Sequence, residues 1–193
     1  MPITLRKTHW RMNKPSIIIT GANWFLGESL VAHFLYKKWQ VKAFVHSVPV
    51  IPVRKLKGVE YVNYSLEILP NEDVFKAVDF LVHCAYLRFE KNKNADLINL
   101  NGTKNLVELC RINNVKSLFI SSFSAHTKAE SHYGKSKLDC EKLFDLTKDI
   151  VLKSGLVIGG KGLASELIKT IKTSKFFPLI GGGEQPMQTI YID

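Results

Sequence analysis

Tyr133 and Lys137 are the two residues of this sequence whose types and spacing best suit proton transfer. They lie in the segment SHYGKSK at 131–137, which is predicted to start a helix. Residues four apart share one face of a helix, and an ammonium group beside a phenol lowers the phenol's pKa from its usual value of about 10. Tyr133 is therefore a candidate general acid or base for a hydroxyl or carbonyl group. The same spacing also occurs by chance, so the interpretation depends on where this helix lies in the fold.

Three serines precede this helix at the end of a predicted strand. The apolar segment Ser117–Ser121 (SLFIS) predicts the strand, and Ser121, Ser122 and Ser124 come at its carboxyl end. Ligands of open α/β sheets bind at the carboxyl ends of the strands. These serines are candidates to hold a substrate oxygen beside Tyr133, although ordinary hydrogen bonding in a turn also explains serines here.

A glycine-bearing turn is the second candidate site. In ITGANWFLGE, at 19–28, Gly21 and Gly27 take the first and last positions of G-x-x-G-x-x-G between a predicted strand and a predicted helix. The free N–H groups at such a helix start bind phosphate, and a middle glycine lets a pyrophosphate approach the backbone. Trp24 stands at that middle position, so the turn predicts either a weakened dinucleotide site or only a tight connection. The candidate contacts are Gly21, Asn23, Trp24, Phe25, Leu26 and Gly27.

The end of the second predicted strand, at His46, bears on the choice between NAD and NADP. In dinucleotide-binding folds a carboxylate at this place binds the ribose of NAD, whereas a basic residue accommodates the 2′-phosphate of NADP. This strand ends in Val-His-Ser without an acid, and His46 is followed by Arg54, Lys55 and Lys57. The pattern favours NADP over NAD as the cofactor, with a simple cap on an exposed strand end as the alternative role of His46.

Alternating apolar runs and helical patterns predict the elements that position these residues. This alternation is typical of a doubly wound parallel α/β sheet with helices on both faces and right-handed crossovers. The predicted strands are Ser16–Thr20, Val41–His46, Val59–Asn63, Asp79–Cys84, Ser117–Ser121 and Ile150–Ile158, with a short strand-like segment at Thr189–Ile192. The predicted helices are at about Leu26–Trp39, Asp96–Asn113, Ser131–Thr147 and Leu163–Ser174.

The composition limits the class of protein. A chain of 193 residues with 46% hydrophobic residues is expected to form one ordinary domain. The net charge of +10 suits a polyanionic partner, but the basic residues are scattered, so nucleic-acid binding ranks last. Cys84, Cys110 and Cys140 lack metal-ligand spacing and predict reduced cysteines and no metal site. Without an apolar run long enough for a signal peptide or a membrane span, the sequence predicts a soluble, cytoplasmic protein with no membrane partner.

Several motifs occur together and in a characteristic order. The segments TGANWFLG, DFLVHCAY, NLNGTKNLVELCRINNVKSLFISS, YGKSK and LKSGLVIGGKG resemble the extended short-chain dehydrogenase/reductases, in particular the NAD(P)-dependent nucleotide-sugar epimerases and dehydratases. The resemblance runs from about Ser16 to the last residue. It implies a Rossmann-like fold, a dinucleotide cofactor (NAD or NADP), and hydride transfer on a sugar nucleotide or a related hydroxyl or carbonyl compound. It also implies a homodimer in which the helices at about 96–113 and 131–147 form a four-helix bundle.

The resemblance assigns roles to individual residues. Gly21 and Gly27 would line the pyrophosphate, Ala85 would pass beside the cofactor, and Asn99 would match a helix asparagine near the site. The implied catalytic set comprises Ser122, with Ser124 as the second choice, Tyr133 as acid or base, and Lys137, which would bind the nicotinamide ribose and tune Tyr133.

The sequence also departs from the pattern that the resemblance implies. Besides Trp24, Ser65 stands where relatives often have an aspartate that contacts adenine, and Lys153 and Ser154 replace an Arg-Pro pair. Relatives continue past a motif like QTIYID, so we expect a truncated C-terminal substrate region. The predicted division is an N-terminal extension at 1–15, an NAD(P)-binding domain at 16–160 and the start of an incomplete substrate-binding region at 161–193.

Two hypotheses of different class follow from these observations. The intact Tyr133/Lys137 pair favours an NAD(P)-dependent epimerase, dehydratase or reductase. The altered turn and the short substrate region favour a catalytically impaired module of the same fold that binds a dinucleotide or a partner without turnover.

Overall fold

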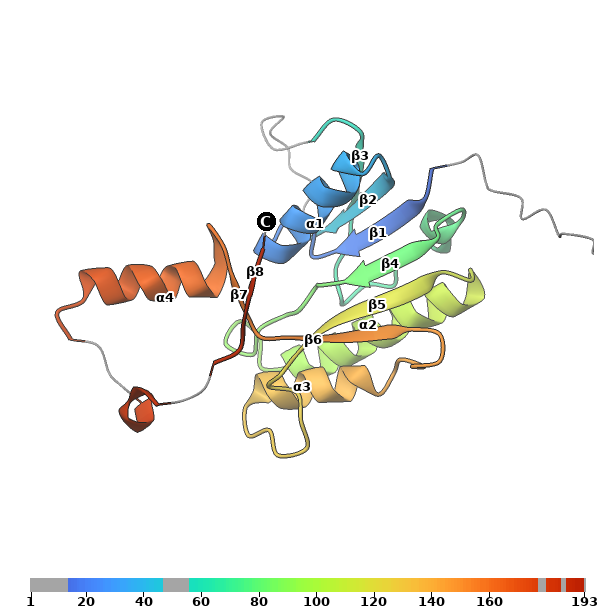
Figure 1. Cartoon of the computed structure of the whole chain (residues 1–193). Coiled ribbons are helices and arrows are strands. Elements are labelled where there is room, and N and C mark those ends of the chain that lie inside the picture. The colour runs from blue at the N-terminus through green and yellow to red at the C-terminus, as the bar shows by residue number, and fades with distance from the viewer. Residues whose placement is uncertain (1–13, 47–55, 177–179, 185–186, 193) are drawn as a thin grey trace, which may run out of the picture.

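Six parallel strands form the central sheet, in the order β3-β2-β1-β4-β5-β6 (Figure 1). The computed structural model describes residues 14–46, 56–176, 180–184 and 187–192. Every neighbouring pair in this sheet is parallel, and the order is that of the doubly wound dinucleotide-binding fold. The predicted Rossmann-like fold class is therefore confirmed. The strands are β1 (Ser16–Thr20), β2 (Gln40–Val45), β3 (Val59–Asn63), β4 (Phe80–His83), β5 (Lys116–Ser122) and β6 (Ile150–Ser154).

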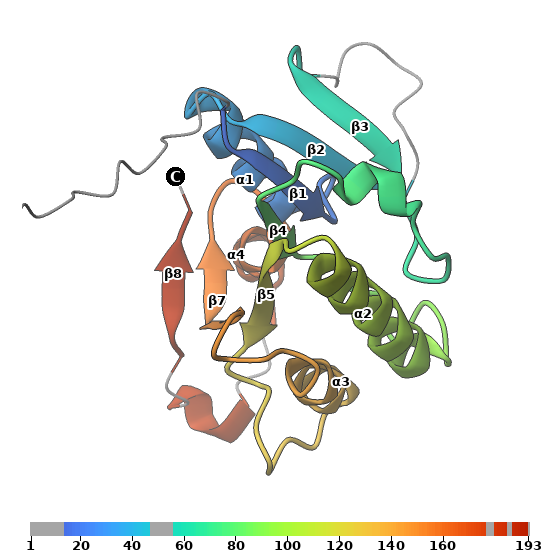
Figure 2. The ribbon, with the colours of Figure 1, turned by 90° about the vertical axis from the view of Figure 1, so that its right-hand side faces the viewer.

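Helices cover both faces of this sheet because β1 is apolar on both sides. Ile17 and Ile19 pack on one face with Val31 of α1 (Phe25–Tyr36), whereas Ile18 packs on the other face with Leu106 of α2 (Ala95–Ile112). Figure 2 shows α1 on one side of the sheet and α2 and α3 on the other. The helices are α1 (Phe25–Tyr36), α2 (Ala95–Ile112), α3 (His132–Glu141) and α4 (Gly162–Thr173), with short 3-10 helices η2 (Glu72–Phe75) and η3 (Ile180–Gly183). Within the described residues, none of these helices has the length and apolar character needed to cross a membrane.

The segment predicted as one strand over 150–158 is two strands in different sheets. The first strand, β6, ends just before Gly155. The next, β7 (Leu156–Ile158), leaves the central sheet and pairs in parallel with β8 (Thr189–Tyr191) in a two-stranded sheet. A Cβ on Gly155 would lie only 2.7 Å from the carbonyl carbon of Gln188. The prediction of one strand over 150–158 is therefore wrong. It could not include the contact with Gln188, which lies far along the chain from Gly155.

The predicted helix at 131–147 is also shorter than expected, since α3 ends at Glu141. Asp145 accepts hydrogen bonds from the backbone N–H and the hydroxyl of Thr147, at 3.0 and 2.7 Å. The backbone N–H of Asp145 donates to Asp149 at 3.0 Å. Local side-chain bonds of this kind compete with the helical backbone bonds and favour turns.

The small sheet and α4 attach to the central domain through the first turn of α1. A Cβ on Gly159 or on Gly162 would lie 2.7 or 2.6 Å from the ring of Phe25, so the backbone of this loop packs directly on that ring. Beside it, the Lys161 ammonium forms an ion pair with Glu28 at 2.7 Å. The start of α1 is thus shared between the two parts of the fold.

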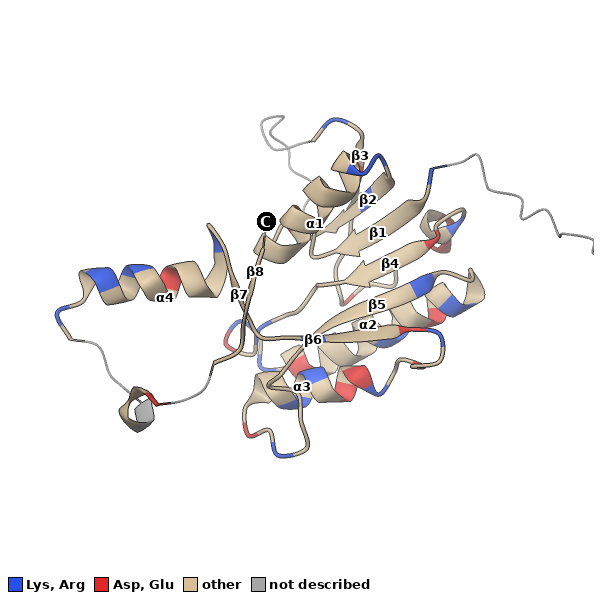
Figure 3. Cartoon of the chain, viewed as in Figure 1, with Lys and Arg blue, Asp and Glu red and all other residues tan. Residues whose placement is uncertain are grey.

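Charged side chains are spread over several elements. Figure 3 shows Lys and Arg mixed with Asp and Glu on α2 and α3, and pairs such as Lys142 with Asp139 lie 2.7 Å apart. The basic residues in this view do not gather on one element. The nucleic-acid hypothesis, which rested on net charge alone, gains no support from this distribution.

Candidate functional site

The turn after β1 has the close packing that its glycines predict. Gly21 has φ +65°, a left-handed conformation that favours glycine, and a Cβ there would lie 3.0 Å from the Cα and N atoms of Ala85. A Cβ on Gly27 would contact the carbonyl oxygen of Gly21 and would lie 2.8 Å from the Cα of Ala22. The start of α1 therefore sits directly on the turn, and the turn sits directly on the end of β4.

Trp24 takes part in this turn through its backbone, because its N–H donates to the Gly21 carbonyl oxygen at 3.0 Å. It is the N-cap of α1 with φ −98° and ψ 163°, an extended conformation that any residue adopts, and its side chain is 62% exposed. The helix starts without a side-chain cap, and its first intrahelical bond is donated by Glu28 to the Trp24 carbonyl at 2.7 Å. The N–H groups of the preceding first-turn residues thus have no acceptor in the helix, which is the arrangement that binds anions.

A buried hydrogen-bond chain begins at Thr20, the last residue of β1. Its hydroxyl oxygen accepts from the backbone N–H groups of Cys84 and Ala85, both at 3.1 Å. The same oxygen lies 2.7 Å from Nδ1 of the fully buried His83. Because the oxygen already accepts twice, its own proton is donated to Nδ1, which must be unprotonated.

The chain continues from His83 to the helices. With Nδ1 as an acceptor, the proton of the neutral ring sits on Nε2 and is donated to the Thr103 hydroxyl at 3.0 Å. Thr103 in turn donates to the Sγ atom of Cys140 at 3.6 Å. One directed chain therefore joins the ends of β1 and β4 to α2 and to α3, the helix that carries Tyr133 and Lys137.

This direction predicts the protonation state of His83. We expect a neutral ring with its proton on Nε2 from about pH 5 to about pH 8, because burial and, secondarily, the charge of Lys137 lower the pKa of His83 to about 3. Two-bond proton–nitrogen spectra of protein with 15N-labelled histidine measure the tautomer, with the signal assigned by its loss in His83→Asn. Since an unfolded histidine takes up its proton near pH 6.5, the free energy of unfolding should fall as the pH decreases below about that value. A protonated Nδ1, or titration of His83 near neutrality, contradicts the chain.

The Tyr133/Lys137 pair lies on one helix, as predicted. The helix begins after Ser131, whose hydroxyl accepts from the N–H of Gly134 at 3.1 Å. Tyr133 is 41% exposed, whereas Lys137 is only 4% exposed. The ammonium of Lys137 donates to the carbonyl oxygen of Ile120 in β5 at 2.7 Å. The two side chains thus start from the same face, but the ammonium is directed to the backbone of the sheet.

The electrostatics of the pair differ from the expected pattern. Burial raises the pKa of Tyr133, and only a hydrogen bond from Ser122 and the charge of Arg88 oppose this effect. Burial lowers the pKa of Lys137 to about 8, while Cys140, Cys84 and Glu141 act in the opposite direction. The expectation that Lys137 lowers the pKa of Tyr133 is therefore wrong for this conformation, because the ammonium is engaged elsewhere. The structure does bring Ser122 and Tyr133 together.

A second polar cluster, which the sequence did not suggest, supports the same helix. Glu141 of α3 accepts a hydrogen bond from Ser121 and an ion pair from Lys153 at 3.0 Å. Lys153 also donates to the carbonyl oxygen of Ala125 at 2.6 Å. Glu141 lies four residues after Lys137, so its place on the same helix face was available as a signal. The lysine at 153 thus joins β6 to α3.

The remaining predicted cofactor residues are placed as follows. Asn99 is 2% exposed, and its side chain accepts from the N–H of Leu87 at 2.8 Å and donates to the Leu87 carbonyl at 2.9 Å. It therefore anchors the loop after β4. His46 lies exposed after β2, with Lys57 also exposed. Arg54 and Lys55, which were expected to support His46, lie outside the described residues.

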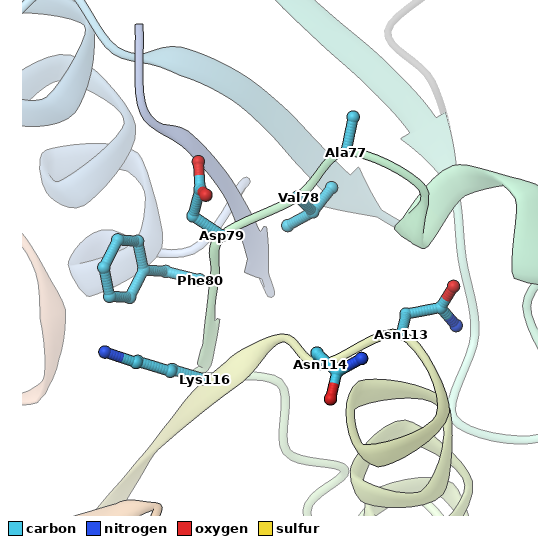
Figure 4. A pocket seen from close by; sticks show the side chains of 7 residues that line it. All are labelled: Ala77, Val78, Asp79, Phe80, Asn113, Asn114 and Lys116. Carbon is cyan, nitrogen blue, oxygen red and sulfur yellow. The ribbon is translucent and has the colours of Figure 1, made fainter. Parts of the chain in front are cut away.

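A surface cavity lies at the opposite end of the sheet. Figure 4 shows it at the amino ends of β4 and β5. Gly21 and Ser122 instead lie at the carboxyl ends of β1 and β5, and Tyr133 lies in the first turn of α3. The lining of the cavity contains none of the candidate residues: it consists of Ala77, Val78, Asp79, Phe80, Asn113, Asn114 and Lys116.

Comparisons with known proteins agree with this geometry. A model of the NAD dependent epimerase/dehydratase family matches residues 17–148. No curated protein matches the sequence. Among solved structures, an NAD-dependent NDP-hexosamine 5,6-dehydratase involved in tunicamycin biosynthesis has a TM-score of 0.74 and 20% identity, over 93% of this chain and 68% of that one.

Two epimerases give similar values. UDP-glucose 4-epimerase from Thermotoga maritima, with UDP-glucose, has a TM-score of 0.71 and 17% identity, over 92% of this chain and 69% of that one. A variant of UDP-glucuronic acid 4-epimerase from Bacillus cereus, in complex with a fluorinated UDP-sugar and NAD, has a TM-score of 0.73 and 20% identity, over 92% and 69%. At these identities the likeness establishes a common fold, over about two thirds of each relative.

Proposed function

The chain belongs to the NAD dependent epimerase/dehydratase family, and from this premise we propose that it binds NAD at the turn between β1 and α1. We further propose that it transfers a hydride between NAD and a nucleotide sugar, with Tyr133 moving the proton. One observation carries the proposal. Ala85 packs on Gly21 of the turn, and the next residue, Tyr86, packs on Tyr133 with ring centroids 5.0 Å apart. The turn proposed to bind the pyrophosphate and the proposed proton carrier are therefore joined through Ala85 and Tyr86 at one end of the sheet.

The turn after β1 and the start of α1 fit a dinucleotide. The two glycines let the turn pack on Ala85 and let α1 start directly on the turn. The uncapped start of α1 favours the pyrophosphate. NAD is favoured over NADP because several solved relatives are described as complexes with NAD. The earlier preference for NADP rested on His46 and on basic residues of which two lie outside the described part of the chain.

The proton chemistry follows from the surroundings of Tyr133. NAD, when bound, supplies the hydride donor or acceptor. Because burial raises the pKa of Tyr133, its phenol is protonated at neutral pH, the form that donates a proton. If a carbonyl carbon of a keto sugar received a hydride from NADH, which would become NAD⁺, Tyr133 would give its phenol proton to the carbonyl oxygen. In the opposite direction, on a sugar hydroxyl, the ionised phenol would accept the hydroxyl proton. Ser122 lies beside the phenol and is placed to hold that oxygen.

The first test is cofactor binding. We expect calorimetric titration to show binding of NADH and NAD⁺ and weaker binding of NADPH. The full chain is used, and UDP-glucose is added in a second titration as a nucleotide-sugar probe. A lack of heat with every dinucleotide at about millimolar concentration would contradict the enzyme proposal.

The second candidate function is a non-catalytic module of the same fold that binds a partner. The enclosed ammonium of Lys137 and the raised pKa of Tyr133 favour it, because an idle Tyr/Lys pair needs no tuning. Dinucleotide binding without measurable hydride transfer would support this candidate.

A further inference from the structure

Tyr86 contacts both members of the Tyr133/Lys137 pair. Its ring meets the Tyr133 ring edge to face, with centroids 5.0 Å apart and planes at 87°. The Nζ atom of Lys137 lies 5.1 Å from the centroid of the same Tyr86 ring. One aromatic side chain thus covers the two groups that the proposed chemistry needs to act together.

The ammonium of Lys137 is enclosed by this contact. It donates to the carbonyl oxygen of Ile120 at 2.7 Å, and the Phe119 ring lies 4.5 Å away by its centroid. With the Tyr86 ring as a further wall, the side chain is only 4% exposed. A ribose hydroxyl therefore has no open path to this ammonium while the Tyr86 ring stays in place.

Two polar groups lie next to Tyr86. A hydrogen bond with the Ser136 hydroxyl of α3 opposes the rise that burial causes in the pKa of Tyr86. The Oδ1 atom of Asp96, whose charge also acts on Tyr86, is buried without a partner among the described residues. Buried polar atoms normally have partners, so this oxygen is an available acceptor beside Tyr86.

We infer that Tyr86 occupies the position of a ligand over Lys137, and that its ring must swing away before the ribose of a dinucleotide can reach the ammonium. This role rests on the proposed function for the identity of the ligand. When the ring moves away, the ribose can reach the Lys137 ammonium. The ammonium and the Tyr133 hydroxyl are then no longer separated by the Tyr86 ring. Tyr86 is then a positioning residue that makes Tyr133 an effective proton carrier only when the cofactor is bound.

Two substitutions separate the ring from the hydroxyl of Tyr86. Tyr86→Ala should bind NADH about tenfold more tightly than the wild type, because the cofactor no longer displaces a ring from a cation. Tyr86→Phe keeps the ring and should bind like the wild type. Tyr36→Ala, which removes an 80% exposed ring at the end of α1, is the matched control and should change nothing.

A cofactor-free measurement keeps the inference separate from the proposed function. The ionisation of Tyr133 is followed by ultraviolet difference titration of each protein against its Tyr133→Phe counterpart. In Tyr86→Ala the phenol should titrate at lower pH than in the wild type, since water and the ammonium then reach it. An unchanged midpoint would overturn the inference, even if every protein failed to bind NADH and the proposed function were lost.

Two other outcomes are decisive. Weaker NADH binding by Tyr86→Ala, with normal binding by Tyr86→Phe, would show that the ring is a platform for the cofactor and would overturn the inference. The wild type provides a test without substitution, since NOEs between the Tyr86 ring and the side chain of Lys137 should be present without cofactor. Their absence would contradict the enclosed ammonium.

Discussion

Replacing Tyr133 with phenylalanine is expected to lower kcat by at least about a hundredfold, the usual contribution of a positioned acid or base. The affinity for NADH should stay unchanged, because the substitution keeps the ring that packs against Tyr86. Since the side chain is 41% exposed, folding should tolerate the change. Hydride transfer to NAD⁺ from a panel of UDP-hexoses that includes UDP-glucose is measured by the rise in NADH absorbance.

A second tyrosine provides the control for this experiment. Tyr191 of β8 is 67% exposed, and Tyr191→Phe removes the same hydroxyl at a place with no proposed role. It should leave kcat unchanged. Undiminished turnover in Tyr133→Phe would show that another group carries the proton, and Ser122 would then be the next residue to replace.

The second large effect is expected at Gly27. Alanine in a helix normally stabilises relative to glycine by up to about 1 kcal/mol, but here the new Cβ would contact the Gly21 carbonyl oxygen and lie 2.8 Å from the Cα of Ala22. Both neighbours are backbone and cannot rotate away. We therefore expect Gly27→Ala to lower the free energy of unfolding by about 1 to 3 kcal/mol, and to weaken dinucleotide binding.

Urea denaturation and NADH titration measure the two effects of Gly27→Ala. Gly160→Ala is the matched control, because a Cβ there meets nothing within 4 Å. It should leave both quantities near their wild-type values. A stabilised Gly27→Ala protein would mean that α1 does not start as close to the turn as the structure has it.

The positions of the strands and the parallel, doubly wound type of sheet could be predicted from the sequence because the apolar runs and their alternation with helices are local patterns. A run such as SIIIT in β1 is buried throughout, and βα alternation with right-handed crossovers leaves few arrangements for such strands. The break at Gly155 could not be predicted in this way. It depends on Gln188, which reaches Gly155 only after the chain has passed through α4.

The sequence predicted which elements carry the candidate residues, but it did not predict their pKa values. Helical spacing placed Tyr133 and Lys137 on one helix, but the pKa of Tyr133 depends on contacts that no spacing encodes. The ammonium binds the Ile120 carbonyl and lies against the Tyr86 ring. The chain through His83 had a usable signal, since parallel pairing of the strands that end in Thr20 and His83 brings these two residues into register.

Phe25 links the opening of the β7–β8 pair to the binding of a ligand at the first turn of α1. Its ring carries the loop of Gly159 and Gly162, and its backbone belongs to the first turn of α1, where a phosphate is proposed to bind. Opening of the β7–β8 pair removes packing from that turn, so a ligand that orders the turn must also slow amide hydrogen exchange in the small sheet. By the same reciprocity, whatever holds β7 and β8 together increases the affinity for the ligand.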